Sequence, residues 1–154
     1  MINRRKTSLI TLSATSLAAL LAYEGYREKA YIPVPGDVPT IGFGTTEGVK
    51  LGDKTDPVKA VSMILRDVQK FEGALKQCVK VPLSQNEYDA YLSLSYNIGP
   101  TAFCGSTLVK RLNLHDYDGA CEQILRWDKF KGRPLAGLTK RRRAEYETCI
   151  KQDS

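Results

Sequence analysis

The spacing of hydrophobic residues divides the chain into three kinds of segment. Residues 7–23 carry no charged side chain and place three leucines on one face of a helix. Residues 31–49 are rich in Pro and Gly around two short β-prone pieces, at 31–32 and 40–43, which predicts a small hairpin or meander. From Pro57 onward, apolar residues recur at three- and four-residue steps, a pattern typical of helices.

Local start and stop signals set the expected helix boundaries. Asp56 followed by Pro57 is typical of a helix N-terminus. Ser84 and Glu87 have the spacing of a capping box, and Gly99-Pro100 is expected to end the helix that they open. Further helices are expected over residues 106–113, 117–127 and about 139–150, the last one capped by Thr139. The sequence therefore predicts an α+β fold that is predominantly helical, with a small N-terminal β-sheet and a helical body flanking a cleft.

The composition is that of one globular domain with a buried core. The 154 residues are 42% hydrophobic and 26% charged, which excludes a disordered chain and a bundle of membrane spans. The net charge of +6 is unevenly distributed, because Arg4, Arg5 and Lys6 contribute half of it and no acidic residue lies within residues 1–23. We therefore divide the chain into a basic flank with an apolar segment over 1–23 and a folded domain over 24–154.

The N-terminal segment has the pattern of an export signal or a membrane anchor, since a basic cluster precedes an uncharged run. The 17 residues of segment 7–23 are at the lower limit for a span, because a bilayer core needs about 20 residues. Six of them are Ser or Thr, so we expect a weak anchor that can leave the bilayer. The sequence before Tyr23 lacks the small-residue pattern of a cleavage site, which favours an uncleaved anchor. The alternative is an amphipathic first helix of a soluble fold.

The four cysteines are too far apart in sequence for a metal or redox motif, so neither a metal nor a cofactor is implied. An even number in an exported chain favours disulfides, with three alternative pairings. Cys121 and Cys149 lie on two expected helices that can face each other, which favours the pairs Cys121 with Cys149 and Cys78 with Cys104. Four reduced, buried thiols are the alternative if the chain is not exported.

Two carboxylates and a hydroxyl follow the apolar segment. Glu24 stands where that segment ends, Asp37 lies in the Pro- and Gly-rich stretch, and Thr40 opens the second β-prone piece. A protonated acid and an ionised carboxylate that activates water are the minimum for acid/base hydrolysis of a glycosidic bond. From residue types alone, the alternative is that Glu24 is a solvated charge at a helix end.

Several sequence blocks carry a family resemblance. They are Glu24 to Tyr31, Pro39 to Thr46, Pro82 to Ala90, Tyr96 to Gly99, Phe103 to Leu108 and Gly137 to Arg142. In this order they resemble the phage-type lysozymes, the muramidases of glycoside hydrolase family 24. The resemblance covers residues 24–150, which makes these the expected catalytic domain. Residues 1–23 resemble the signal-anchor-release subgroup, endolysins that are exported tethered to the inner membrane and become active when the anchor leaves it.

The resemblance implies a lysozyme-like fold and hydrolysis of the β-1,4 bond between N-acetylmuramic acid and N-acetylglucosamine in bacterial peptidoglycan, which lyses the host. Glu24 matches the catalytic acid of the family. The usual position of the second carboxylate falls on Pro33, which cannot act as a base, so we expect Asp37 to serve the water from a displaced position and Thr40 to orient it. A turn role for Asp37 and a plain strand role for Thr40 are the alternatives. Thr45 stands where the family often carries His.

The resemblance also implies the partners. They are peptidoglycan glycan strands and, before release, the inner membrane. After release the protein is expected to be a soluble monomer in the periplasm. Two other functions remain open on the sequence: a lytic transglycosylase that uses Glu24 alone, because Asp37 is displaced, and a catalytically inactive wall-binding module.

A basic stretch lies near the C-terminus. Residues 126–143 hold eight basic side chains and a single acidic one, which suits an anionic polymer such as the cell wall. Nucleic acid is not expected, because no recognition motif accompanies the charge. Arg141 and Arg142 have a structural alternative, in which they pair with acidic residues between helices.

Overall fold

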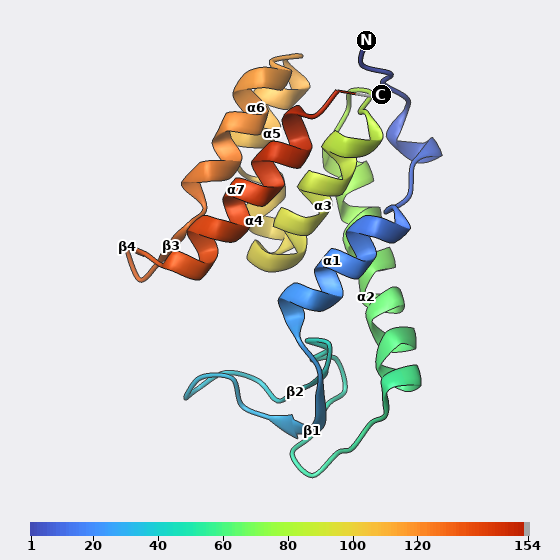
Figure 1. Cartoon of the computed structure of the whole chain (residues 1–154), viewed down its shortest axis with the longest axis vertical. Coiled ribbons are helices and arrows are strands. Elements are labelled where there is room, and N and C mark those ends of the chain that lie inside the picture. The colour runs from blue at the N-terminus through green and yellow to red at the C-terminus, as the bar shows by residue number, and fades with distance from the viewer. Residues whose placement is uncertain (153–154) are drawn as a thin grey trace. The chain divides into compact units, whose positions relative to one another are not determined.

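The structure, a computed structural model, describes residues 1–152 (Figure 1). The helices and strands are η1 (Thr7–Leu9), α1 (Ala14–Glu24), β1 (Arg27–Tyr31), β2 (Thr40–Gly42), α2 (Pro57–Cys78), α3 (Gln85–Ile98), α4 (Pro100–Cys104), α5 (Thr107–Asn113), α6 (Tyr117–Gln123), η2 (Ile124–Arg126), β3 (Lys129–Phe130), β4 (Arg133–Pro134) and α7 (Ala136–Ile150). The two η elements are 3₁₀ helices. The predicted α+β class with dominant helices is confirmed.

The chain forms two compact units. We call residues 14–70 the hairpin unit, and residues 1–13 together with the described chain from Phe71 onward the helical unit. Residues 1–13 therefore belong with the C-terminal helices. The expected division at residue 23 separates a membrane anchor from a catalytic domain. It is a division by function, which the two compact units do not test, so it stays a prediction.

The hairpin unit contains α1, the antiparallel β1–β2 pair and the first part of α2. Arg27 pairs with Gly42 and Tyr31 with Thr40, so the predicted hairpin is present. Its first strand runs over Arg27–Tyr31, however, and not over the predicted piece at 31–32. Asp56 caps α2, since its Oδ1 accepts a hydrogen bond from the Lys59 N–H at 2.9 Å. Apolar side chains of α1, β2 and α2 form the core of this unit: Leu20, Ile41, Ala60, Ile64 and Val68.

The helical unit is built around α3, which runs beside α7 (Figure 1). The predicted capping box is present, because Ser84 Oγ accepts from the Glu87 N–H and the Glu87 carboxylate accepts from the Ser84 N–H. Gly99 ends α3 as expected, and Pro100 then opens α4, since proline fits the first position of a helix.

Two predicted helix boundaries are wrong. The last helix begins at Ala136 rather than Thr139, because the Thr139 N–H already bonds the Leu135 carbonyl. The Thr139 hydroxyl instead donates to Asp128, 2.9 Å away. The helix expected over 117–127 ends at Gln123 and continues as a 3₁₀ turn.

Two of the arginines in the basic stretch are internal. Arg142, fully buried, pairs with Glu145 at 2.8 Å and donates to Asn97 Oδ1 on α3. Arg141 donates to the Ser93 carbonyl. Both arginines thus pair with Glu145 on their own helix, and their burial leaves a smaller basic surface than the sequence predicted. Burial raises the pKa of the Glu145 carboxyl, whereas Arg142, the Ser93 hydroxyl and Arg141 lower it.

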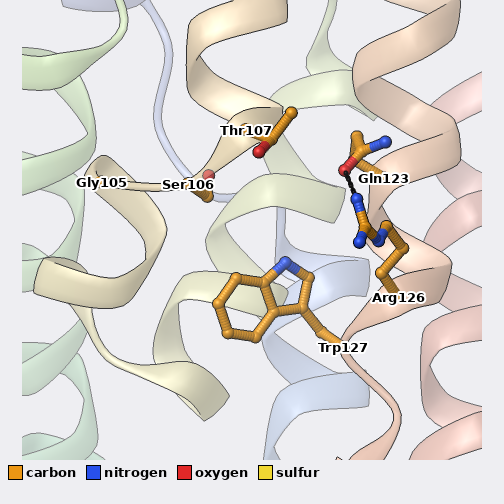
Figure 2. A pocket seen from close by; sticks show the side chains of 6 residues that line it. All are labelled: Gly105, Ser106, Thr107, Gln123, Arg126 and Trp127. Carbon is orange, nitrogen blue, oxygen red and sulfur yellow. Dashed lines mark hydrogen bonds between the residues drawn. The ribbon is translucent and has the colours of Figure 1, made fainter.

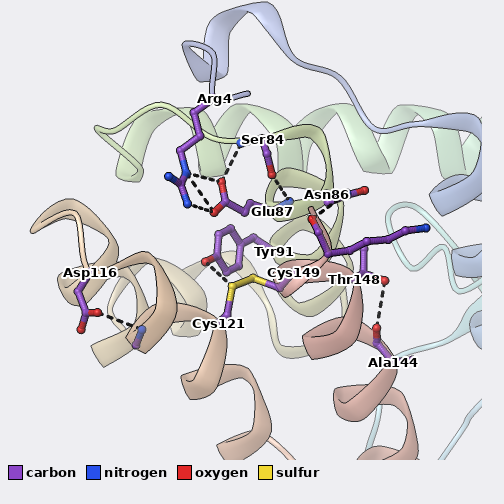
Figure 3. Close-up of a disulfide and its surroundings, with 12 residues drawn as sticks. Arg4, Ser84, Asn86, Glu87, Tyr91, Asp116, Cys121, Ala144, Thr148 and Cys149 are labelled. Carbon is purple, nitrogen blue, oxygen red and sulfur yellow. Dashed lines mark hydrogen bonds and ion pairs between the residues drawn. A yellow bond between two sulfur atoms is a disulfide. The ribbon is translucent and has the colours of Figure 1, made fainter. Parts of the chain in front are cut away.

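The cysteines form the two disulfides that the sequence favoured. Cys78 pairs with Cys104 and Cys121 with Cys149, with Cα–Cα distances of 5.6 and 5.8 Å. Figure 3 shows the Cys121–Cys149 bond between α6 and α7, with the Tyr91 hydroxyl 3.7 Å from Cys121 Sγ. The second disulfide therefore ties the last helix to the bundle.

Residues 4–13, which we call the N-terminal arm, lie in the helical unit. Arg4 forms an ion pair with Glu87 at 2.8 Å (Figure 3). Its guanidinium lies 3.5 Å from the centre of the Tyr117 ring. Arg5 and Leu83 exchange two backbone hydrogen bonds of 2.8 Å. Ile10 is buried.

The end of the arm meets two further carboxylates. The Leu12 N–H donates to Glu72 at 2.7 Å, and the Ser13 N–H and hydroxyl donate to Asp89 at 3.0 and 2.7 Å. Segment 7–23 thus consists of a 3₁₀ turn, four residues outside any helix or strand, and all of α1 except Glu24. Among residues 1–152 there is no helix with both the length and the apolar character needed to span a bilayer.

Replacing Cys121 and Cys149 by Ser is expected to destabilise the protein. The bond closes a loop with a sequence separation of 28 residues, for which the lost constraint on the unfolded chain is worth about 3.5 kcal/mol. Urea unfolding of the double variant under non-reducing conditions measures this loss. An unchanged midpoint would mean that the bond does not hold α7 in place.

Arg4→Met is expected to lower the free energy of unfolding by about 2 kcal/mol, because it leaves the buried Glu87 carboxylate without its cation. Arg5→Met is the matched control, since the exposed Arg5 side chain donates to the neutral Gln85 side chain at 3.3 Å. Urea unfolding of both purified variants gives the comparison. Equal stability of the two would show that the Arg4–Glu87 pair contributes nothing.

Candidate active site

Glu24 is the last residue of α1 and is half-buried. Gly25 follows in the left-handed region with φ +67°, its N–H bonding the Leu21 carbonyl, so the helix stops and β1 starts at Arg27. The local fold thus places the half-buried Glu24 side chain at the junction between α1 and β1.

The turn after β2 lies directly against the Glu24 carboxylate. Gly44 has φ +94°, and a Cβ built on it would lie 3.0 Å from Glu24 Oε2. A side chain here would push the carboxylate aside by a few tenths of an ångström, and the positive φ would strain its backbone, so the position suits glycine. The sequence did not single out Gly44. Its place in the Gly-Phe-Gly turn was the available signal.

Thr40 and Asp37 lie on either side of Val38. The Thr40 side chain is buried at the start of β2, and its hydroxyl donates to the Val38 carbonyl at 3.2 Å. Asp37 is exposed, and its Oδ1 accepts from the Val38 N–H at 2.8 Å. The Asp37 N–H bonds the Val34 carbonyl, so the carboxylate sits on a defined turn. The backbone of one residue therefore connects the two groups expected to handle water.

Strand β2 connects Thr40 to the turn at Gly44. Thr40 opens β2, opposite Tyr31, and the Gly44 turn that contacts Glu24 follows β2. All three predicted site residues thus belong to the hairpin unit.

Thr45 and Asp67 support the same turn. The buried Thr45 hydroxyl donates to Asp67 Oδ2 on α2 at 2.8 Å. The sequence noted Thr45 only as a departure from the family and missed Asp67, because a contact across 22 positions leaves no local signal.

A separate pocket of about 350 Å³ lies in the helical unit (Figure 2). It is lined by Gly105, Ser106, Thr107, Gln123, Arg126 and Trp127. Arg126 donates to Gln123 Oε1 at 3.3 Å. The indole of Trp127 lies beside the space between these two side chains and Thr107. An aromatic face with a few polar groups is a lining that suits sugars and amides.

No group of three His, Cys, Asp or Glu side chains within residues 1–152 is arranged to hold a metal ion.

The chain is similar to known phage enzymes over most of its length. Residues 21–145 match the profile of the phage lysozymes. The endolysin of Acyrthosiphon pisum secondary endosymbiont phage 1 is 43% identical over 138 residues, which cover 87% of this chain and 94% of that protein. The SAR-endolysin of Pseudomonas phage phiKMV is 39% identical over 145 residues, covering 92% and 89%.

A solved structure shares the fold. The endolysin from Escherichia coli O157:H7 phage FAHEc1 superimposes with a TM-score of 0.79 at 37% sequence identity, covering 92% of this chain and 94% of that one. The expected lysozyme-like fold is thereby confirmed. With the profile match over most of the sequence and relatives at this level of identity, the chain belongs to the phage lysozyme family.

Proposed function

We propose that this endolysin hydrolyses the β-1,4 bond between N-acetylmuramic acid and N-acetylglucosamine of peptidoglycan, with Glu24 as the general acid. The observation that carries the proposal is the position of Glu24. Its carboxylate ends α1, is half-buried, and lies against a glycine that leaves it room. The surrounding segment is part of the region that matches the phage lysozyme profile.

In this mechanism Glu24 protonates the glycosidic oxygen as the bond to the anomeric carbon breaks. A water molecule attacks the anomeric carbon and gives up one proton, so that each new chain end carries a hydroxyl group. An ionised Asp37 can take that proton. The Val38 N–H occupies one of the four acceptor sites of its carboxylate, which leaves others for water.

Thr40 is suited to orient the same water. Its hydroxyl hydrogen is used by the Val38 carbonyl, so towards water its oxygen acts as an acceptor. Two acceptors, Asp37 and Thr40, direct both water hydrogens towards the protein and leave an oxygen lone pair for the sugar. The exposure of Asp37 leaves its carboxylate open to water.

A lytic transglycosylase reaction is the second candidate. It needs Glu24 but no carboxylate for water, and the exposed turn position of Asp37, displaced from its usual place in the family, is the observation that favours it. Mass spectrometry of the products separates the two reactions, because hydrolysis gives free reducing ends and transglycosylation gives 1,6-anhydro ends.

We also propose that segment 7–23 tethers the protein to the inner membrane, facing the periplasm, before release. The basic flank and uncharged run support this, as does the naming of the phiKMV relative as a SAR-endolysin. After release the protein takes the fold described above, in which Arg4 pairs with Glu87 and Glu24 ends α1.

Glu24→Gln is expected to lower the rate of peptidoglycan cleavage at least about 100-fold, since Gln keeps the size of the side chain but cannot donate the proton. Mass spectrometry of muropeptides released from purified sacculi measures the rate and identifies the ends. Full activity of this variant would refute the assigned role.

Asp37→Asn is expected to reduce hydrolysis about 100-fold, because the amide keeps an acceptor for the Val38 N–H but cannot take a proton from water. Asp53→Asn is the control, since Asp53 is another exposed loop carboxylate that accepts a backbone N–H, from Lys50. The same product assay applies. If Asp37→Asn matches this control, Asp37 has no part in the mechanism, and 1,6-anhydro products would then identify the transglycosylase.

A further inference from the structure

The turn that contacts Glu24 is closed by a pair of backbone hydrogen bonds. The Ile41 N–H donates to the Thr45 carbonyl at 2.9 Å, and the Thr45 N–H donates to the Ile41 carbonyl at 3.0 Å. Both residues are buried, with 3% and 1% of their surface exposed. Residues 42–44 therefore form a short loop whose two ends are held together and cannot spread.

The loop is also held on α2 at both ends. At Gly42, φ is +64° and a Cβ would lie 3.0 Å from the Ala60 Cβ, so the backbone of the loop rests directly on the helix. At Thr45, the hydroxyl donates to Asp67 Oδ2 at 2.8 Å. A hydrogen bond to a carboxylate is about twice as strong as one between neutral groups. Ala60 and Asp67 are seven residues apart, two turns of one helix, and so act as two fixed points.

The part of the loop between these points is Gly44, which faces the carboxylate of Glu24. Gly44 and the carboxylate are near neighbours, because a Cβ added to Gly44 would lie 3.0 Å from Oε2. A shift of the loop towards Glu24 would displace the carboxylate, and a shift away would remove one wall of its site. A misplacement of about 1 Å in a reacting group can cost about 100-fold in rate.

We propose that Thr45 and Asp67 are positioning residues for the reaction: their hydrogen bond fixes the Gly44 turn, and the turn fixes the carboxyl group of Glu24. Neither side chain touches the substrate in this account. The inference rests on the proposed role of Glu24 as the acid, and it adds the part of α2 that keeps this acid in place.

The test compares Thr45→Val with Thr45→Ser. Valine keeps the shape of threonine and removes the donor, whereas serine keeps the donor. On purified soluble glycan strands, kcat of Thr45→Val is expected to fall about 10- to 100-fold with KM within about threefold. Thr45→Ser is expected to stay within about threefold of the wild type in both constants. Assays run well below the unfolding temperature of each variant, so that reduced stability alone does not change kcat.

Two further variants keep the proposal open to refutation if Thr45→Val does not fold. Asp67→Asn retains an acceptor oxygen for the Thr45 hydroxyl, so its kcat is expected to stay close to that of the wild type. Asp67→Ala has no such acceptor, and its kcat is expected to fall as far as that of Thr45→Val. Glu47→Gln, which removes the exposed ion pair with Lys70 after the turn, is the control and is expected to leave kcat unchanged.

The outcomes separate this proposal from the proposed function. Wild-type kcat in folded Thr45→Val or Asp67→Ala, with Glu24→Gln inactive, overturns the positioning role alone. An equal loss of kcat in Thr45→Val and Thr45→Ser also overturns it, because the hydroxyl would then not be the cause. Activity retained in Glu24→Gln overturns the assignment of the acid and this inference with it.

Discussion

The ion pair between Arg4 and Glu87 holds the N-terminal arm in the folded protein. The Glu87 side chain is almost fully buried and also closes the capping box of α3, the helix around which the helical unit is built. A carboxylate in this position needs a cation, and Arg4 supplies it from 83 residues away in sequence. The backbone hydrogen bonds of Leu12 and Ser13 to further carboxylates continue this arm up to the first residue of α1.

These contacts and a place in the bilayer exclude each other. A membrane-spanning helix must satisfy its backbone groups within itself, so the N–H groups of Leu12 and Ser13 could not donate to Glu72 and Asp89. A span that begins at residue 7 also leaves Arg4 on the cytoplasmic side, away from Glu87. Because α1 ends on Glu24, the proposed anchor includes the helix that carries the proposed acid. For a phage lysozyme, tethering would therefore delay activity until the segment leaves the membrane.

Local sequence signals predicted the features that residues close in sequence determine, which are helix ends and the hairpin. The capping box at Ser84, the start of α2 at Pro57 and the β1–β2 hairpin are each decided within a few positions, and all three are present. The sequence also located Glu24 at a helix end, because hydrophobic periodicity and Gly25 mark that boundary.

Contacts between distant positions left no such signal. Thr45 meets Asp67 across 22 residues, and Arg4 meets Glu87 across 83. Charge counting placed Arg141 and Arg142 in a basic stretch, but both are buried, because Glu145, Ser93 and Asn97 provide them with partners. Thr139 has the residue type of an N-cap, yet α7 starts three residues earlier, at Ala136.

The central claim is that segment 7–23 has two mutually exclusive conformations: one spans the membrane in the inactive protein, and the other is part of the folded, active protein. Ser8, Thr11 and Thr15 are exposed in the folded protein, so leucine at these positions strengthens the anchor without removing a described side-chain contact. Alanine at the same positions is the control. The measurement is peptidoglycan cleavage by the membrane-held triple-leucine variant and by the same variant refolded in soluble form. We predict cleavage by the soluble form only, and cleavage at an equal rate by the membrane-held form would contradict the account.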